Sequence, residues 1–470
     1  MLFPTLTFAV FLTLVLAAHT VLLERKTMWK LTMLTASYVF YAWWDWRFLT
    51  LIWISTAIDF VSGQVIYRST STRIRRFFLL FSLVGNLGML GFFKYADFFV
   101  ESFVNLMADI GLVVSAEPLG IILPVGISFY TFQTMSYSID IYRKKMLPTP
   151  SLLDFALFVG FFPQLVAGPI VRARDFLTQL SNESRAPIDV GKSLKLILGG
   201  LFKKVVIADI LAAELVDDVF ANPNGSTGLE TLFAIYGYAI QIYADFSGYS
   251  DIAIGIALLL GFKFEMNFNQ PYRATSLQDF WRRWHISLST WLRDYLYVSL
   301  GGNRRGRIFT CRNLLLTMIL GGLWHGAAFS FLVWGVIHGL LLVIERSYKE
   351  WRLEYGKPQK AFRILQIVFT FHLVCATWVI FRSANLNRSF EVFSALGNSW
   401  NSAPSLTRGV LLVLLVGFGT QFVRPGLTDP FWIRLGQAPV IVQALVVSSV
   451  LVLINTIGPD GVAPFLYFQF

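Results

Sequence analysis

Two histidines stand in segments that could carry acid–base chemistry. The segment GGLWHGAAFSFLVWG, residues 321–335, places His325 among apolar, glycine, alanine and serine residues, and WRRWHISLSTWLRDY, residues 281–295, contains His285. Burial lowers the pKa of histidine from about 6.5 and favours the neutral imidazole. A neutral imidazole can take a proton from a hydroxyl group, so each histidine is a candidate general base. The alternative is structural, because a histidine between tightly packed helices can simply be hydrogen-bonded.

Further polar residues interrupt the apolar segment QIYADFSGYSDIAIG, residues 241–255, namely Gln241, Tyr243, Asp245 and Asp251. A carboxylate at the centre of a membrane helix costs roughly 2.5–3.5 kcal/mol unless it is paired, so both should be paired or face an aqueous cavity. One interpretation is structural pairing with one of three arginines, Arg273, Arg282 or Arg283. The other is that the segment lines a substrate path.

The sequence lacks the common motifs of metal, nucleotide and serine-hydrolase sites. Its only cysteines, Cys311 and Cys375, cannot form a cysteine metal site, and the five histidines lack enough neighbouring ligands. No His-Glu-x-x-His, Gly-x-Ser-x-Gly, phosphate loop or Gly-x-Gly-x-x-Gly is present. We therefore expect no bound metal and no bound cofactor.

The composition is that of a membrane protein. Hydrophobic residues make up 55% of the 470 residues and charged residues 14%, with a mean hydropathy of +0.60, whereas soluble domains carry about 25% charged residues. We predict an all-α polytopic membrane protein with about 10 to 13 transmembrane helices. The apolar stretches are 2–23, 31–44, 48–67, 77–93, 121–142, 152–171, 194–212, 230–262, 313–344, 364–381, 408–423 and 439–456.

The net charge of +11 comes largely from basic residues in short loops, including 25–30, 68–76, 143–145 and 304–312. Such clusters are typical of cytoplasmic loops in membrane proteins and explain the charge better than a nucleic-acid partner does. Placing the first three in the cytoplasm puts the N-terminus on the outer, periplasmic side. We expect membrane lipid as the surroundings and no nucleic acid as a partner.

Two segments should depart from simple spans. The first is FFPQLVAGPIVR, residues 161–172, where Pro163 and Gly168–Pro169 interrupt a run that is apolar enough to cross a membrane. Such a break in the backbone is tolerated within a membrane only where it is packed in protein or lines a water-filled cavity. Residues 281–295 are predicted as a helix with tryptophans on one face and arginines on the other, lying in or re-entering the membrane interface.

Because no long linker separates the stretches, we expect a single membrane domain over 1–470. It would comprise N-terminal helices (1–150), a catalytic core (151–345) and C-terminal helices (346–470).

Four phrases together resemble the membrane-bound O-acyltransferase family, in its bacterial, alginate-acetylating branch. They are the 161–172 segment, DFSGYSDIAIG at 245–255, QPYRATSLQDFWRRWHISLSTWLRDYLYVSLGGNR at 270–304, and GGLWHGAAFSFLVWGVIHG at 321–339. The resemblance implies helices around a central funnel or tunnel that opens to both sides. It also implies that the histidine of WHG, His325, is catalytic and that the histidine of RRWHIS, His285, lines the same passage.

The chemistry implied by this resemblance is acyl transfer from a cytoplasmic thioester to a hydroxyl group that arrives from the other side. We expect His325 to act as the base, and His285 to orient the donor or stabilise charge on the carbonyl oxygen. The predicted substrate-binding residues are Arg283, Trp284, Asn303, Asp245, Gln241 and Tyr243, with Arg283 or Asn303 anchoring the donor.

Two donors fit the basic 304–312 loop, acetyl-coenzyme A and an acyl carrier protein, since both present a thioester on a phosphopantetheine arm. In a bacterial inner membrane, the acceptor would be a periplasmic acetyltransferase partner or an exopolysaccharide such as alginate or cellulose. Three alternatives remain: D-alanyl transfer to a cell-wall polymer, a transporter or flippase without covalent chemistry, and a structural subunit that anchors a periplasmic transferase.

Overall fold

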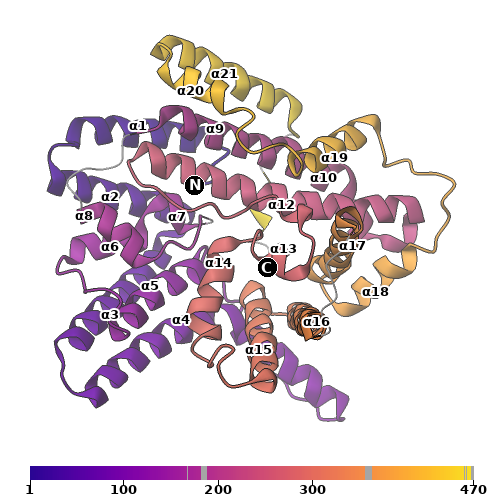
Figure 1. Ribbon diagram of the computed structural model, residues 1–470, viewed down its shortest axis with the longest axis horizontal. Coiled ribbons are helices and arrows are strands. Elements are labelled where there is room, and N and C mark those ends of the chain that lie inside the picture. The colour runs from indigo at the N-terminus through magenta and orange to yellow at the C-terminus, as the bar shows by residue number, and fades with distance from the viewer. Residues whose placement is uncertain (167, 182–187, 355–361, 460, 462, 467–470) are drawn as a thin grey trace. The chain divides into compact units, whose positions relative to one another are not determined.

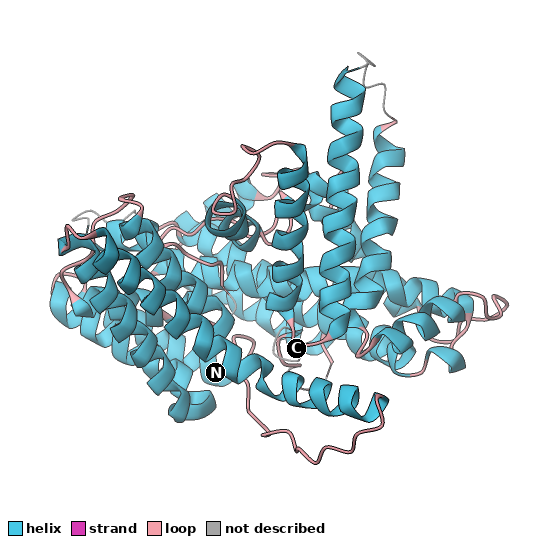
Figure 2. Cartoon of the chain, turned by 90° about the horizontal axis from the view of Figure 1, so that it is seen from below, coloured by secondary structure: helices cyan, strands magenta, loops and turns pink. Residues whose placement is uncertain are grey.

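The computed structural model describes residues 1–470 except 167, 182–187, 355–361, 460, 462 and 467–470. All regular elements of the described residues are helices, which confirms the all-α prediction (Figures 1 and 2). The chain forms two compact units: unit 1 comprises Met1–Ile188 and Ile256–Glu265, and unit 2 comprises Asp189–Gly255 and Met266–Phe470. The expected single domain with its internal boundaries and the expected central funnel stay predictions.

Unit 1 is a bundle in which α5 packs against both α3 and α4. Its elements are α1 (Leu6–Leu22), α2 (Lys26–Asp45), η1 (Trp46–Phe48), α3 (Leu49–Arg68), α4 (Thr72–Asp109), α5 (Ile127–Tyr142), α6 (Leu152–Gly160), α7 (Phe162–Leu165) and α8 (Ala173–Ser181). The buried carboxylate of Asp59 on α3 accepts hydrogen bonds from Ser82, Asn86 and Ser138. These neutral donors satisfy the hydrogen-bonding capacity of the buried carboxyl oxygens inside the bundle.

The predicted break at 161–172 is confirmed. Helix α6 ends at Gly160, Phe161 leaves the helical conformation (φ −58°, ψ 112°), and α7 has only four residues. The break is packed in protein, because the fully buried ring of Phe161 contacts Phe176 and Phe262 at centroid distances of 5.2 and 5.0 Å. Aromatic packing thus surrounds backbone that lipid alone could not accommodate.

Unit 2 is built around the long helix α12, whose most apolar window is 89% buried. Its elements are α9 (Val190–Leu201), the π-helix η2 (Phe202–Ala208), α10 (Asp209–Leu211), η3 (Ala212–Val216), α11 (Asp217–Ala221), η4 (Pro223–Gly225), α12 (Gly228–Leu259), η5 (Pro271–Arg273), α13 (Leu277–Trp281), α14 (Ile286–Trp291), the π-helix η6 (Leu292–Tyr297), α15 (Arg307–His325), α16 (Phe329–Glu354), α17 (Arg363–Arg382), α18 (Leu386–Ala395), α19 (Arg408–Thr420), α20 (Asp429–Gln437) and α21 (Val440–Ile457). The last residues of α12, from Ile256, belong to unit 1.

Helices α15 and α16 form a tight antiparallel hairpin, seen side by side in Figure 1. Glycines permit this approach: a Cβ atom on Gly322 would lie 2.4 Å from the carbonyl oxygen of Phe331, and one on Gly335 would lie 2.5 Å from that of Met318. Small residues at helix contacts are typical of membrane proteins. The hairpin holds His325 at the point where α15 ends.

Among the described residues, six segments are long and apolar enough to cross a membrane. They are Lys26–Arg68, which contains both α2 and α3, Thr72–Asp109, Gly228–Leu259, Phe329–Leu353, Arg363–Arg382 and Val440–Ile457. Other expected stretches form shorter helices: α1 and α19 are apolar but have fewer than 18 residues, and 152–171 is divided between α6 and α7. The chain is a multi-pass membrane protein, and its exact number of crossings stays a prediction.

Candidate active site

His325 is the last residue of α15 and is buried within aromatic rings. Its ring centroid lies 5.1 Å from that of Trp324, 5.4 Å from Trp334 and 5.3 Å from Phe381, each nearly edge-on. The helix ends here because Gly326 is extended, and a Cβ atom at this position would lie 2.0 Å from the ring of Phe331. The glycine after the histidine therefore lets an aromatic ring close over the site.

The prediction of one continuous helix over 281–295 is wrong. Helix α13 ends at Trp281, His285 adopts a left-handed conformation (φ 41°, ψ 57°), and α14 begins at Ile286. Asn267 explains the break, because its backbone carbonyl accepts from the N–H of Ile286 (2.9 Å) and its side chain from the N–H of Ser287 (3.1 Å). These tertiary hydrogen bonds take two backbone donors that a continuous helix would use internally.

The predicted apolar face of this segment is nevertheless the buried one. Trp284, Leu288, Trp291, Leu292 and Tyr295 are all buried. Trp284 packs in unit 2 against Phe268 and Trp378, each at a centroid distance of 5.0 Å.

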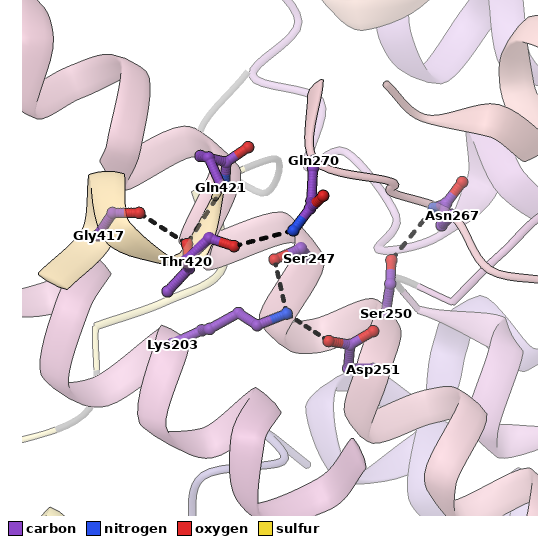
Figure 3. A network of polar contacts seen from close by, with 9 residues as sticks. All are labelled: Lys203, Ser247, Ser250, Asp251, Asn267, Gln270, Gly417, Thr420 and Gln421. Atoms are coloured by element: carbon purple, nitrogen blue, oxygen red, sulfur yellow. Dashed lines mark hydrogen bonds and ion pairs between the residues drawn. The ribbon is translucent and has the colours of Figure 1, made fainter. Parts of the chain in front are cut away.

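Asn267 also determines which nitrogen of His285 carries the proton. Its Oδ1 accepts from the backbone N–H and the hydroxyl of Ser287, and a backbone N–H can only donate, so the amide orientation is settled. His285 Nδ1 lies 3.1 Å from the same oxygen and must donate to it, which leaves the lone pair on Nε2. The Asn267 amide nitrogen in turn donates to Ser250 on α12 (3.1 Å; Figure 3).

His285 is fully buried and lies outside the candidate spans. Burial lowers the pKa of its imidazole to about 3, so the ring is neutral at physiological pH. Phe246 on α12 packs edge-on against it at 4.6 Å.

The two histidines contact the same tryptophan. The ring centroid of Trp324 lies 5.9 Å from that of His285 and 5.1 Å from that of His325. The structure thus brings together, in unit 2, two residues that are 40 positions apart in the sequence. Their aromatic surroundings exclude water, and a low dielectric strengthens each hydrogen bond made there.

The other histidines make structural hydrogen bonds. The indole N–H of Trp281 donates to His338 Nδ1 (3.3 Å), and His338 Nε2 donates to the hydroxyl of Thr377 (3.0 Å). The proton is on Nε2 because the Thr377 hydroxyl itself donates to the carbonyl of Val374. His19 and His372 also make hydrogen bonds between helices, to Trp29 (2.9 Å) and Tyr236 (2.7 Å).

The acidic residues of α12 are paired, but not with the arginines that we expected. Asp245 binds Lys204 Nζ at 2.6 Å, and Asp251 binds Lys203, which also contacts Ser247 (Figure 3). Lys204 reaches Asp209 as well, at 2.8 Å. Both lysines belong to η2, within a stretch that we interpreted only as an apolar span.

The three arginines have other contacts or face outward. Arg283 pairs with Asp279 at 2.9 Å, Arg273 donates to Gln270 Oε1 at 2.7 Å, and Arg282 is exposed. The pairing predicted from proximity in the sequence is therefore wrong, whereas the expectation that buried carboxylates are compensated is confirmed.

The remaining predicted substrate residues differ in position. Gln241 is buried, and its Oε1 has no hydrogen-bond partner among the residues that the structure describes. Tyr243 is buried with Lys203 Nζ 5.8 Å from its ring centroid. Asn303 is exposed and precedes α15. The first residue of that helix, Arg307, is about 27 Å along the helix axis from His325. Their substrate-binding roles stay predictions.

One buried donor that the sequence did not reveal lies beside His325. The indole N–H of Trp334 has no hydrogen-bond partner within the described parts of the chain, although the side chain is only 1% exposed. Buried tryptophan N–H groups usually find an acceptor. An oxygen atom of a bound substrate could supply one.

A sequence model of the membrane-bound O-acyltransferase family matches residues 127–383, which include the two candidate catalytic histidines, His285 and His325. The chain is 40% identical over 468 residues to "Probable alginate O-acetylase AlgI" of Pseudomonas putida, covering 94% of each protein. It is 36% identical to "Peptidoglycan O-acetyltransferase" of Helicobacter pylori (78% of this chain, 73% of that protein) and 31% identical to "Teichoic acid D-alanyltransferase" of Bacillus subtilis (56% and 70%).

The chain therefore belongs to the membrane-bound O-acyltransferase family. It is an O-acyltransferase, which sets aside the transporter and the purely structural subunit.

Proposed function

We propose that this enzyme moves an acetyl group from a cytoplasmic thioester towards the hydroxyl groups of a polysaccharide outside the inner membrane. The observation that carries the proposal is the placement of His285 and His325 on one buried tryptophan. The printed names of two relatives, an alginate O-acetylase and a peptidoglycan O-acetyltransferase, support acetyl as the group and a polysaccharide as the acceptor class. The donor is acetyl-coenzyme A or an acetylated carrier protein, and a periplasmic transferase can relay the group.

In the proposed reaction, His325 accepts the proton of the acceptor hydroxyl while its oxygen attacks the thioester carbonyl. The carbon–oxygen ester bond forms, the carbon–sulfur bond breaks, and the departing thiolate takes the proton from the imidazole. General-base assistance of this kind contributes about 10²–10⁴-fold to the rate.

The protonation state of His285 narrows its role. A neutral ring with the proton on Nδ1 has only a lone pair at Nε2, so it cannot donate a hydrogen bond from Nε2 to a carbonyl oxygen. Of its two expected roles, orientation is the one that fits: Nε2 would accept a hydrogen bond from the donor, for example from an amide N–H of a phosphopantetheine arm. Asn267 is then a positioning residue.

The hydrogen bond to the developing oxyanion is assigned to Trp334. Its indole N–H is buried without a described partner, and its ring centroid lies 5.4 Å from that of His325. A donor aimed at the carbonyl oxygen would stabilise the charge that forms during attack.

The test uses purified protein in nanodiscs with acetyl-labelled coenzyme A or carrier protein, and alginate or cellulose oligosaccharides as acceptors. Label should reach an oligosaccharide with the wild type and with His372→Ala, a matched control in which an exposed histidine of unit 2 is replaced, but not with His325→Ala. Equal transfer by His325→Ala would contradict the proposal. Consumption of a D-alanyl carrier thioester, with no use of either acetyl donor, would favour the D-alanyl alternative.

A further inference from the structure

A cavity of about 420 Å³ lies in unit 2 away from the histidines. Its walls come from the start of α13, the second half of α16 and the first half of α17. The first α16 residue in its wall, Leu341, is about 18 Å along the helix from Phe329, at the end of α16 that follows His325. The cavity is therefore separate from the candidate active site.

The α16 wall changes from apolar to charged along one helix face. Its residues recur every three or four positions: Leu341, Ile344, Glu345, Tyr348, Lys349 and Arg352. The distance from the first to the last is about 16 Å along the axis. Phe369 and Leu373 of α17 complete the apolar end.

Among the lining residues that the structure describes, the charged rim carries more positive than negative charge. Glu345 pairs with Lys349 and accepts from the backbone N–H of Gln278 at 3.1 Å, while Lys349 also donates to Gln278 Oε1 at 3.2 Å. Arg352 lies over the ring of Tyr348, with its guanidinium carbon 5.7 Å from the centroid. Two cations against one carboxylate favour an anion at the rim.

The apolar end of the cavity lies on the exposed, bilayer-facing side of two candidate membrane spans. Both α16 and α17 contain candidate spans, and the wall residues Ile344 and Phe369 are 62% and 70% exposed. A molecule that already lies in the bilayer could enter sideways with its chain against these residues. A fully water-soluble anion would leave this apolar end unused.

The rim is level with a basic loop. Glu350 of α16 lies 3.7 Å from Arg307 at the start of α15, within the 304–312 cluster that we expect at the cytoplasmic surface. Anionic lipids are attracted to such basic regions.

We propose that this cavity binds one anionic phospholipid. An acyl chain would lie against Leu341, Ile344 and Phe369, and the phosphate would lie beside Lys349 and Arg352.

The test is native mass spectrometry of the full chain mixed with equal amounts of phosphatidylglycerol and phosphatidylcholine of the same acyl length. The wild type should retain phosphatidylglycerol preferentially, and Lys349→Ala/Arg352→Ala should reduce that retention by about tenfold or more. Arg346→Ala is the matched control, since Arg346 lies on the same helix and pairs with Glu350 but does not line the cavity. It should retain the lipid as the wild type does.

Three outcomes would overturn the proposal. They are equal retention of both lipids by the wild type, an equal loss with the control variant, and displacement of phosphatidylglycerol by free coenzyme A, which would indicate a donor phosphate site instead. Thermal unfolding of each variant identifies any loss caused by misfolding. The readout needs no enzymatic activity, so its failure is distinguishable from failure of the proposed acetyl transfer.

Discussion

The region around His338 and the region around His285 and His325 are both buried and rich in aromatic rings, yet their polar groups are used differently. Around His338 the hydrogen bonds form a closed chain from Trp281 through the imidazole to Thr377 and a backbone carbonyl. Around the other pair, Asn267 settles the proton on His285 Nδ1. The ring of Trp334 packs against both His325 (5.4 Å) and His338 (4.5 Å), and its N–H has no partner among the described residues. A series of hydrogen bonds whose donors and acceptors are all matched within the protein is structural. A buried donor without a described partner, such as the Trp334 N–H, is suited to a substrate.

The largest effect that sharpens this comparison is expected from Trp334→Phe. This change keeps an aromatic ring and removes the proposed oxyanion donor, so kcat should fall by about 10²–10³-fold with little change in the thermal midpoint. Trp281→Phe is the matched control, because the indole N–H of Trp281 already donates a hydrogen bond to His338. Steady-state acetyl transfer measures both, and equal small effects would contradict the assignment of Trp334.

Replacing each histidine by alanine should separate orientation from structure. His285→Ala should lower kcat by about 10²-fold, because a misoriented donor loses the reactive geometry. His338→Ala should instead leave the indole N–H of Trp281 without its acceptor, remove the hydrogen bond that Thr377 accepts, and reduce the free energy of unfolding by about 1–3 kcal/mol. Activity and thermal unfolding of each variant check the division, which a large loss of kcat in folded His338→Ala would break.

Asn267→Ala should reduce kcat by about 10–100-fold, as is usual when the partner that orients a functional histidine is lost. Asn267→Asp keeps an oxygen acceptor for His285 and should recover part of the rate. Its negative charge should raise the pKa of the imidazole and move the acid limb of the pH–rate profile upward. If Asn267 merely supports the fold, the pH profile of Asn267→Asp will match that of the wild type.

A smaller effect concerns the pH dependence of stability. Between pH 6.5 and about 3, the unfolded chain protonates His285 while the folded chain does not, so the unfolded state binds more protons. The free energy of unfolding should therefore decrease as the pH falls through this window, by up to about 1.4 kcal/mol per pH unit. Thermal unfolding of the wild type and His285→Gln tests the sign, since the variant should show the shallower slope.

Periodicity and resemblance predicted what depends on local sequence. Apolar runs indicated helices, and Pro163 and Gly168 marked a break. The WHG phrase pointed to His325, which the structure buries among aromatic rings and whose catalytic role stays a prediction. The burial of Trp284 and its apolar neighbours also followed from the helical spacing, even though the helix itself is interrupted at His285.

Contacts between distant segments could not be predicted in this way. The pairing of Asp245 with Lys204 joins α12 to a π-helical segment 41 positions earlier, and hydropathy contains no signal for it. Asn267 looked like an ordinary loop residue, yet its hydrogen bonds interrupt a helix and orient His285. Trp334 looked like one more apolar residue, because an unmatched N–H is visible only when its surroundings are known.

The most direct test of the shared site is a double-mutant cycle on His285 and His325. Rates of acetyl transfer to an oligosaccharide would be measured for both alanine variants and for their combination, with folding checked for each. Residues that act together in one transition state are strongly non-additive, so the double variant should be about as slow as the slower single variant. A double variant whose loss equals the product of the two single losses would show independent contributions and would contradict the account.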